Sequence, residues 1–536
     1  MFRLYGAAAA LVHGDGHLQE RGFRPTSLGV PSSPRKRGPA FTGRRDGLAA
    51  EQISRMTPVN LSWLPPLLAQ ASDRLTGNLG ELAGGATVWL AVTGLSRSGK
   101  TVFITSLIHN LLSSLHNPNR MPLLGVVGER RLIAAGLEGA GEHRLAQFPY
   151  LRNIEKMASP DWPERTADIS EIGIEMRFAP AGALGKLLSE ITGSPASLTF
   201  RIVDYPGEWL LDLPLLAQSY AEWSRATLQR LRRGVRAEIA RDFLALIAQH
   251  HPDETASEEL AKAAHDSYCA FLLEARDRHG LSLLQPGRFL CRGTLADASY
   301  LAFAPLEVAE DVDTFAPHSL GALMAERFEA YKREAVTPFY RDHFQRYSRQ
   351  IVLVDVLRAL LAGREAFEDT RLALDAILES FRYGHGGILS KLLLGPHIDK
   401  VLFAATKADH VPDIQRDHLA ALLRNMAAFP ALEVRSSNAQ FEVMALASVI
   451  STRDDTQEIE GQRLQVVVGR PVGSSKQSKF FVGNVPIRPP RPDAWGSPFL
   501  NVPVFEPPPI DPSPVDGIAH INLDLALDFL LGDRLR

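Results

Sequence analysis

Gly94-Leu95-Ser96-Arg97-Ser98-Gly99-Lys100-Thr101 stands between two regular patterns of the chain. Residues 86–92, before it, are apolar and β-prone, and residues 101–112, after it, carry apolar side chains at helical spacing. A glycine-bounded loop between a strand and a helix is the context of a phosphate-binding P-loop. The presence of both flanking patterns argues against the alternative, a glycine-rich turn with a solvated lysine.

The chemistry of such a loop assigns a role to each of its residues. Its backbone N–H groups point inward at negative charge, supported by the positive end of the following helix. Lys100 adds a mobile cation, and the Thr101 hydroxyl is placed to ligate the magnesium ion that bridges the outer phosphates. The residues expected to bind the nucleotide here are Gly94, Ser96, Arg97, Ser98, Gly99, Lys100, Thr101 and Val102.

A second change from strand to loop supplies an acid. Residues 198–203 alternate in polarity and end at Asp204, which Tyr205-Pro206-Gly207-Glu208 follows. Asp204 is expected to hold magnesium through a water molecule. The N–H of Gly207 is expected to meet the terminal phosphate, because only glycine permits so close an approach. This Asp-x-x-Gly arrangement is typical of GTPases, although Asp-Tyr-Pro-Gly also favours an ordinary turn.

A third element points to the base. Residues 400–405 have the pattern of a buried strand and run directly into Thr406-Lys407-Ala408-Asp409. The Asp409 carboxylate can accept hydrogen bonds from the ring N–H and the exocyclic amine of guanine, a pairing that adenine cannot make. Lys407 is expected to lie along the base; the alternative for Asp409 is a helix N-cap. Beyond the next predicted strand, 441–445, the N–H groups expected to meet the guanine carbonyl belong to Ala447 and Ser448.

With these motifs in place, the chain resembles the YcjX-like family of P-loop proteins from about residue 61 onward. The further matching segments are Trp162-Pro163-Glu164-Arg165-Thr166, Asp204-Tyr205-Pro206-Gly207-Glu208-Trp209 and His520-Ile521-Asn522-Leu523-Asp524. The resemblance implies a cytoplasmic Ras-like GTP-binding protein of bacteria, with a helical insertion and a role in stress and the phage-shock response. Thr406 departs from the asparagine of many GTPases, and Glu208 from the glutamine of Ras-like enzymes.

Glu208 bears on the rate of hydrolysis. A glutamine there orients the attacking water, whereas an ionised glutamate only accepts hydrogen bonds and is repelled by the terminal phosphate, so slow intrinsic hydrolysis is predicted. The alternative is that Glu208 is an exposed switch residue. Arg97 and Arg165 are candidates for an arginine acting in cis, against plain solvation or a salt bridge. Thr166 is the candidate switch threonine that closes over magnesium, or else a loop threonine.

Composition limits the other classes of function. The chain has 536 residues, 45% of them hydrophobic, which is enough for a sizeable core and more than one domain. A net charge of -3 argues against nucleic acid as an obligate partner. Cys269 and Cys291 lack metal-ligand spacing, so a reducing cytosol fits. No uncharged apolar run reaches the roughly 18 residues of a spanning helix. Residues 61–68 leave peripheral attachment, for instance at the inner membrane, open.

The predicted fold class is α/β. It comprises a Ras-like P-loop sheet flanked by helices, a large all-helical insertion and a small β-containing C-terminal extension. Residues 223–247 and 258–279 have helical periodicity with mixed charge, whereas β-branched and proline-rich runs follow residue 461. The predicted boundaries are 1–55 for a disordered extension ahead of a start at Met56, 56–85 for an N-terminal helix and linker, 86–209 and 350–460 for the core, 210–349 for the insertion and 461–536 for the extension.

The predicted function is hydrolysis of GTP to GDP with Mg²⁺, used as a switch toward an unidentified protein effector. An insertion attached directly after Gly207 is placed to convert order in that loop into movement. Two alternatives stay open. One is a GTP/GDP-gated scaffold with negligible turnover, which Glu208 favours, and the other is an ATP-using P-loop ATPase or kinase.

Overall fold

The computed structural model describes residues 86–139, 145–164, 168–182, 189, 193–295, 298–380, 398–427, 439–459, 461–496 and 500–536. All of these residues belong to one compact unit, Leu82–Arg536. The predictions for residues 1–55 and 56–85 therefore lie outside the described residues, as do those for Arg165 and Thr166.

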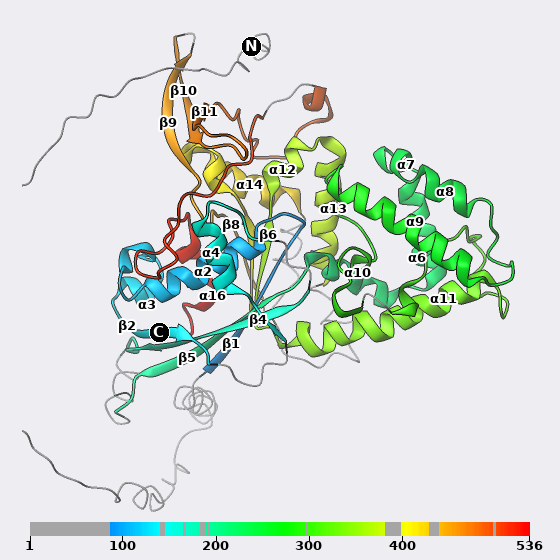
Figure 1. Ribbon diagram of the computed structural model, residues 1–536, viewed down its shortest axis with the longest axis horizontal. Coiled ribbons are helices and arrows are strands. Elements are labelled where there is room, and N and C mark those ends of the chain that lie inside the picture. The colour runs from blue at the N-terminus through cyan, green and yellow to red at the C-terminus, as the bar shows by residue number, and fades with distance from the viewer. Residues whose placement is uncertain are drawn as a thin grey trace, which may run out of the picture. The chain divides into compact units, whose positions relative to one another are not determined.

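A mixed β-sheet forms the centre of the described chain (Figure 1). Its strands are β1 (Ala86–Gly94), β2 (Leu132–Leu137), β3 (Ala146–Gln147), β4 (Ser170–Phe178), β5 (Ala196–Asp204), β6 (Arg349–Val354), β7 (Lys400–Ala405) and β8 (Gln440–Ala445). The order is β2-β4-β5-β1-β6-β7-β8, and β3 pairs with β4. From β5 to β8 the neighbouring strands are parallel, whereas β4 is antiparallel to both β5 and β2. The predicted α/β sheet is thus present, and it is largely parallel.

The central strands are buried on both faces, which explains their continuous apolar sequences. Every residue of β6 is buried. Ile351 and Leu353 pack into one hydrophobic core, while Val352 and Val354 pack into the other. Successive side chains of a strand point to opposite faces, so a single strand contributes to both cores.

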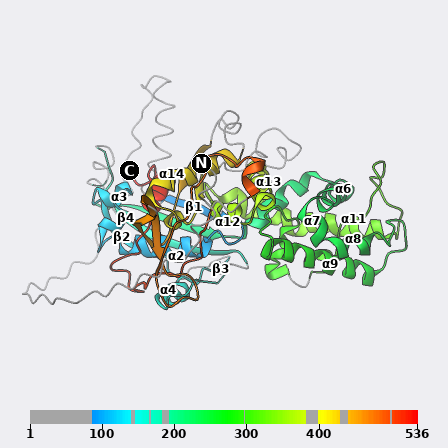
Figure 2. The same ribbon diagram turned by 90° about the horizontal axis from the view of Figure 1, so that it is seen from above.

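Helices cover both faces of the sheet. The core on one side contains side chains from α2 (Lys100–Ser113), α3 (Gly125–Gly128), α4 (Tyr150–Ala158) and α16 (Leu523–Leu531). The core on the other side contains side chains from α12 (Val356–Leu361), α13 (Arg364–Ser380) and α14 (Arg416–Met426). Figure 2 shows β1 between α2 and α14. This layering places the ends of the parallel strands, and the loops after them, at one edge of the sheet.

The chain between β5 and β6 is helical. It starts with a 3-10 helix, Gly207–Ala217, and continues through α6 (Tyr220–Leu231), α7 (Val235–Ile239), α8 (Arg241–Ile247), α9 (Glu258–Asp277), α10 (Gly287–Leu290) and α11 (Leu320–Tyr331). The periodic segment 223–247 holds three helices rather than one continuous helix. Gly234, with a φ of 54°, separates α6 from α7 because that backbone conformation ends a right-handed helix.

The segment that follows Gly207 is hydrogen-bonded to the later part of the helical insertion. The buried Asp212 carboxylate accepts hydrogen bonds from the Gly287 N–H at 2.8 Å and from the Tyr331 hydroxyl at 2.5 Å. Burial raises the pKa of Asp212 to about 6. The Trp209 indole N–H donates to the Cys291 carbonyl at 3.1 Å. A change in the backbone at Gly207 is therefore linked directly to the helices of the insertion.

A second, antiparallel sheet lies near the C-terminus. It consists of β9 (Thr452–Ile459), β10 (Gln462–Gly469) and β11 (Ser478–Phe480). The predicted boundary between core and extension, at residues 460 and 461, is wrong, because β9 pairs with β10 and not with the central sheet. The predicted helix at 523–531 is confirmed as α16. Its apolar side chains pack into one of the two hydrophobic cores of the central sheet, so it is not part of a separate extension.

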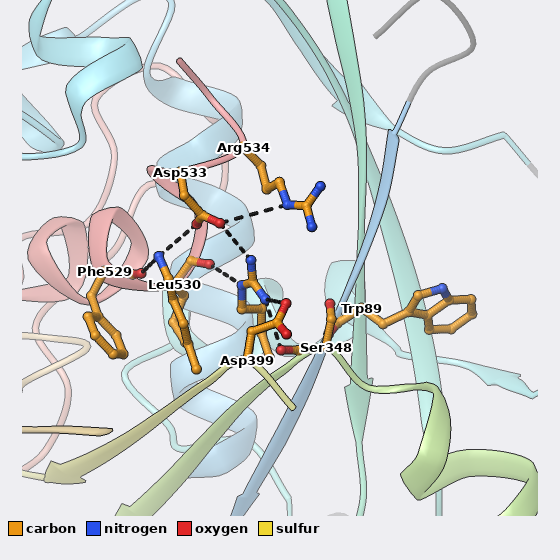
Figure 3. A network of polar contacts seen from close by, with 9 residues as sticks. Trp89, Ser348, Asp399, Phe529, Leu530, Asp533 and Arg534 are labelled. Atoms are coloured by element: carbon orange, nitrogen blue, oxygen red, sulfur yellow. Dashed lines mark hydrogen bonds and ion pairs between the residues drawn. The ribbon is translucent and has the colours of Figure 1, made fainter. Parts of the chain in front are cut away.

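Arg349, at the beginning of β6, links α16 to the central sheet. Figure 3 shows this polar network and labels the acceptors Asp399, Leu530 and Asp533. The Arg349 side chain is 1% exposed. The guanidinium donates to the Leu530 carbonyl at 2.8 Å, to Asp399 at 2.5 Å and to Asp533 at 2.8 Å. Lys400 also donates to Asp533, at 2.7 Å. The guanidinium also donates to the Ser348 carbonyl at 3.0 Å. Each carboxylate in this network thus has a cationic partner, and the buried cation has four acceptors, three of them from distant parts of the chain.

We expect Arg349→Met to lower the free energy of unfolding by about 3 kcal/mol, because it leaves the Leu530 carbonyl and part of the carboxylate charge without a partner. Urea unfolding followed by circular dichroism measures this loss. Arg534→Met is the matched control, since Arg534 is 37% exposed and lies 3.7 Å from Asp533. A loss for Arg349→Met no larger than that of the control would show that α16 does not depend on this network.

Candidate nucleotide-binding site

The loop between β1 and α2 has the tight backbone that its sequence predicts. β1 ends at Gly94 and α2 begins at Lys100. Arg97 and Gly99 have φ angles of 64° and 89°, so both lie in the left-handed region. Gly99 caps α2, and its carbonyl accepts the first helical hydrogen bond, from the Phe103 N–H, at 2.9 Å. The loop thus turns sharply into the positive end of a helix of 14 residues.

Two glycines allow the second motif to touch the first. A Cβ atom on Gly207 would lie 2.2 Å from the Gly94 carbonyl oxygen, and a Cβ atom on Gly94 would lie 2.3 Å from Ser98 Oγ. Neither position accommodates a larger residue. The Asp-x-x-Gly backbone therefore packs directly on the loop that is expected to bind phosphate.

A pocket of about 830 Å³ opens over this loop. Of the residues predicted from the sequence, those that line it are Ser96, Arg97, Ser98, Gly99, Lys100, Thr101, Val102, Glu208, Thr406, Lys407, Asp409, Ala447 and Ser448. Gly94, Asp204 and Gly207 are buried and do not line the pocket. Within the described part of the chain, Ser98 Oγ is one of the buried polar atoms with no hydrogen-bond partner, and it lies close to Gly94.

The oxygen donors next to the loop fit a magnesium ion, which prefers hard oxygen ligands. The Thr101 hydroxyl donates its proton to the Glu164 carbonyl at 3.2 Å, and a hydroxyl oxygen is among the ligands that magnesium takes. Asp204 ends β5 in register with Val92 of β1, just ahead of the loop, and is 1% exposed. These two residues would hold the metal, together with Thr166, whose role stays a prediction.

The loop after β7 brings a buried carboxylate into the pocket. Lys407 has a φ of 62°, and its ammonium lies 2.5 Å from Asp355, so the lysine is held beside the end of β6. Asp409 is 3% exposed and accepts hydrogen bonds from the Ser451 N–H at 2.9 Å and the Ser451 hydroxyl at 2.5 Å. Both donors bind the same oxygen, Oδ2, so the helix-cap alternative for Asp409 is not what the structure shows.

The prediction for Ala447 is wrong. Its N–H donates to the Ile521 carbonyl at 3.1 Å, in an antiparallel bridge with the segment before α16, and is therefore not available to a base. Ser448 lines the pocket, and its carbonyl accepts a hydrogen bond from the Ser106 hydroxyl at 2.5 Å. Sequence reasoning missed Ser451, because nothing local marks a serine whose partner lies 42 residues earlier.

Positive side chains from the insertion reach the phosphate end of the pocket. Arg276, at the end of α9, and Arg292 both line the pocket. The Arg97 guanidinium lies 3.6 Å from the Asp277 carboxylate, so this loop arginine is salt-bridged to the insertion rather than simply solvated. Arg276 also donates to Asp277, at 2.9 Å. The amphipathic pattern of α9 gave no sign that its last turn would meet the P-loop.

The fold and the site together define a P-loop protein of the α/β class. The chain belongs to the YcjX-like family (DUF463), whose model matches residues 88–535. It is 36% identical over 463 residues to the Ras-like GTPase YcjX of Escherichia coli, covering 83% of this chain and 96% of that protein. It is also 36% identical over 464 residues to the Ras-like GTPase YcjX of Shewanella oneidensis, covering 83% and 94% of the two chains.

The described helices also bear on membrane insertion. None of the helices in the part of the chain that the structure describes combines the length and the apolar character needed to cross a bilayer.

Proposed function

We propose that this chain binds guanine nucleotides and hydrolyses GTP to GDP with magnesium, as a nucleotide-gated switch. The observation that carries the proposal is one pocket, which is lined both by the loop 96–102 and Glu208 and by Lys407 and Asp409. A phosphate-binding loop and a buried carboxylate acceptor thus face one space, as a guanine nucleotide requires. The names of the two relatives, both Ras-like GTPases, support the same function.

Different residues at the site bind the phosphates, the magnesium ion and the base. Lys100 and the backbone N–H groups of the loop bind the phosphates, while Thr101, Asp204 and Thr166 hold the magnesium ion. When bound, the ion neutralises charge on the outer phosphates. Asp409 accepts from the base, and the two donors of Ser451 fix its carboxylate. Ser448 is the remaining candidate for a backbone donor to the guanine carbonyl.

The proposed switch has a direct route into the insertion. Gly207 would sense the terminal phosphate, and two residues further on Trp209 is bound to Cys291 and lies beneath the Arg288 guanidinium, 3.3 Å from the ring centre. Loss of the terminal phosphate would free Gly207 and change these contacts. The output is a changed surface for an unidentified protein effector, in the cytoplasm or at the inner membrane. The family resemblance favours a stress response as its physiological setting.

Glu208 makes slow turnover part of the proposal. Its carboxylate lines the pocket and can only accept hydrogen bonds when ionised, so it positions water poorly beside a terminal phosphate. Arg97, Arg276 and Arg292 line the same pocket and are the candidates for an arginine acting in cis. Arg97 and Arg276 both form an ion pair with Asp277, at 3.6 and 2.9 Å, whereas Arg292 contacts the His265 imidazole at 3.0 Å, so the structure does not rank the three.

We expect Glu208→Gln to raise the single-turnover rate of GTP hydrolysis on the order of tenfold, with little change in GTP affinity, because an amide both donates to and accepts from the attacking water. Phosphate release in magnesium, from enzyme in excess over GTP, measures the rate. Glu164→Gln is the matched control, because Glu164 also lines the pocket but pairs with Lys156 at 2.6 Å. Hydrolysis no faster than in buffer for both wild type and Glu208→Gln would favour the scaffold.

A further inference from the structure

A short apolar segment from beyond the small sheet forms part of the pocket. Residues 502–505, Val-Pro-Val-Phe, all line it, although they lie far along the chain from the P-loop, Asp204 and Asp409 motifs. We call this segment the C-terminal wall. It carries no charged side chain and no hydroxyl, in contrast to the loop that faces the phosphates.

The C-terminal wall is held firmly by β10 and the turn after it. The Val472 N–H donates to the Val504 carbonyl at 2.9 Å, and the Glu506 N–H donates to the Arg470 carbonyl at 2.8 Å. Phe505 is fully buried and pairs with Pro471 in an antiparallel bridge. These contacts fix the backbone of the wall on both sides of Val504, so its position is set by the fold and not by a ligand.

Two contacts of Phe505 place the C-terminal wall beside the loop of Asp409 and beside the segment 162–164. Its ring packs edge-on against the ring of His410, with centroids 4.9 Å apart, and His410 directly follows Asp409. Its carbonyl accepts a hydrogen bond from the Trp162 indole N–H at 2.9 Å. The wall therefore runs from the loop of Asp409 to the segment 162–164, whose Glu164 carbonyl accepts a hydrogen bond from Thr101 of the P-loop.

The small sheet also holds Asp409 itself. Ser451 binds the Asp409 carboxylate, and the hydroxyl of Thr452, the first residue of β9, donates to the Asp409 carbonyl. β9 pairs with β10, and the wall is hydrogen-bonded to residues 470–472, which directly follow β10. One sheet thus positions both the carboxylate at the edge of the expected base and an apolar surface beside it.

Val504 is the residue of the wall whose apolar side chain is exposed. It is 59% exposed and lines the pocket, whereas Phe505 is buried. We propose that the C-terminal wall is the surface on which the purine ring of the bound nucleotide packs, with Val504 as the side chain in contact with its face. Covering an exposed aliphatic side chain with a flat ring removes apolar surface from water.

This inference rests on the proposed function for the identity of the base as guanine. The packing itself does not depend on the hydrogen-bonding pattern of the ring, because every purine presents an apolar face. A failure of guanine selectivity and a failure of the wall would therefore be distinguishable in one set of measurements.

The test compares a complete nucleotide with a probe that has no base. We expect Val504→Ala to weaken GDP binding about fivefold to tenfold, the effect of losing two buried methyl groups, and to leave the affinity for inorganic tripolyphosphate unchanged. Titration calorimetry in magnesium measures both. Val472→Ala is the matched control, because Val472 is 57% exposed on the adjoining turn but does not line the pocket.

Each outcome decides the proposal. Weaker GDP binding with unchanged tripolyphosphate binding, and no effect of Val472→Ala, supports the C-terminal wall. Unchanged GDP binding overturns it, and so does an equal loss for GDP and tripolyphosphate, which would place the effect at the phosphate end. If wild-type protein bound ADP and GDP equally, the guanine assignment would fail, and the effect of Val504→Ala on either nucleotide would still decide whether the wall contacts the base.

Discussion

Replacing Lys100 with alanine should weaken binding of GDP and GTP at least about a hundredfold. Lys100 begins α2 and lines the pocket, where its ammonium is a cation supplied by the loop itself. Removing a charge that pairs with phosphate in a partly desolvated site costs about 3 kcal/mol or more. Displacement of a fluorescent GDP analogue measures the loss.

A suitable control for this variant removes a lysine without touching the site. Lys262 lies on the exposed face of α9, where it pairs with Asp266 and is 72% exposed. Lys262→Ala should bind GDP as the wild type does, and both variants should unfold at the same urea concentration as the wild type. If Lys100→Ala kept full affinity while remaining folded, the loop 94–101 would not be the phosphate site.

Exchanging Asp409 for asparagine should transfer the preference of the pocket from guanine to xanthine nucleotides. We expect GTP affinity to fall about a hundredfold and XTP affinity to rise to near the wild-type value for GTP. The reason is geometric as well as chemical. Ser451 donates twice to Oδ2, so the asparagine oxygen can keep that position while its amide faces the base and donates to the extra carbonyl of xanthine.

Asp413→Asn is the corresponding control for the Asp409 exchange. Asp413 is an exposed carboxylate of the same loop and does not line the pocket. Its exchange should leave both GTP and XTP affinities unchanged. Unaltered GTP affinity in Asp409→Asn would remove this carboxylate from the base pocket and reduce it to a structural partner of Ser451.

The parts of the fold and site that follow from the sequence are those set by local pattern. The strand before Gly94, the helix after Lys100 and the strand before Thr406 each carry their own periodicity, and each lies where it was predicted. The order of these motifs along a parallel sheet brings their ends to one edge. The sequence alone therefore predicts that Lys100 and Asp409 lie at one nucleotide-binding pocket.

The parts that the sequence did not reveal depend on contacts between distant segments. Ser451 donates hydrogen bonds to Asp409, and the Ile521 carbonyl accepts one from the N–H of Ala447. The C-terminal wall lines the pocket although the sequence predicts that it belongs to an extension. Arg276 ends an amphipathic helix with no local sign of a ligand. Periodicity reports which face of an element is buried, but it does not report which other element covers that face.

The most direct measurement of the central claim is a competition titration of wild-type protein, preloaded with fluorescent GDP in magnesium, against GTP, GDP and ATP. The pocket described above predicts that GTP and GDP displace the probe at similar concentrations and that ATP needs at least about a hundredfold more, because adenine offers an acceptor to Asp409 in place of a donor. Displacement by ATP at the same concentration as GTP would contradict a guanine-reading site and turn the pocket into that of an ATP-using protein.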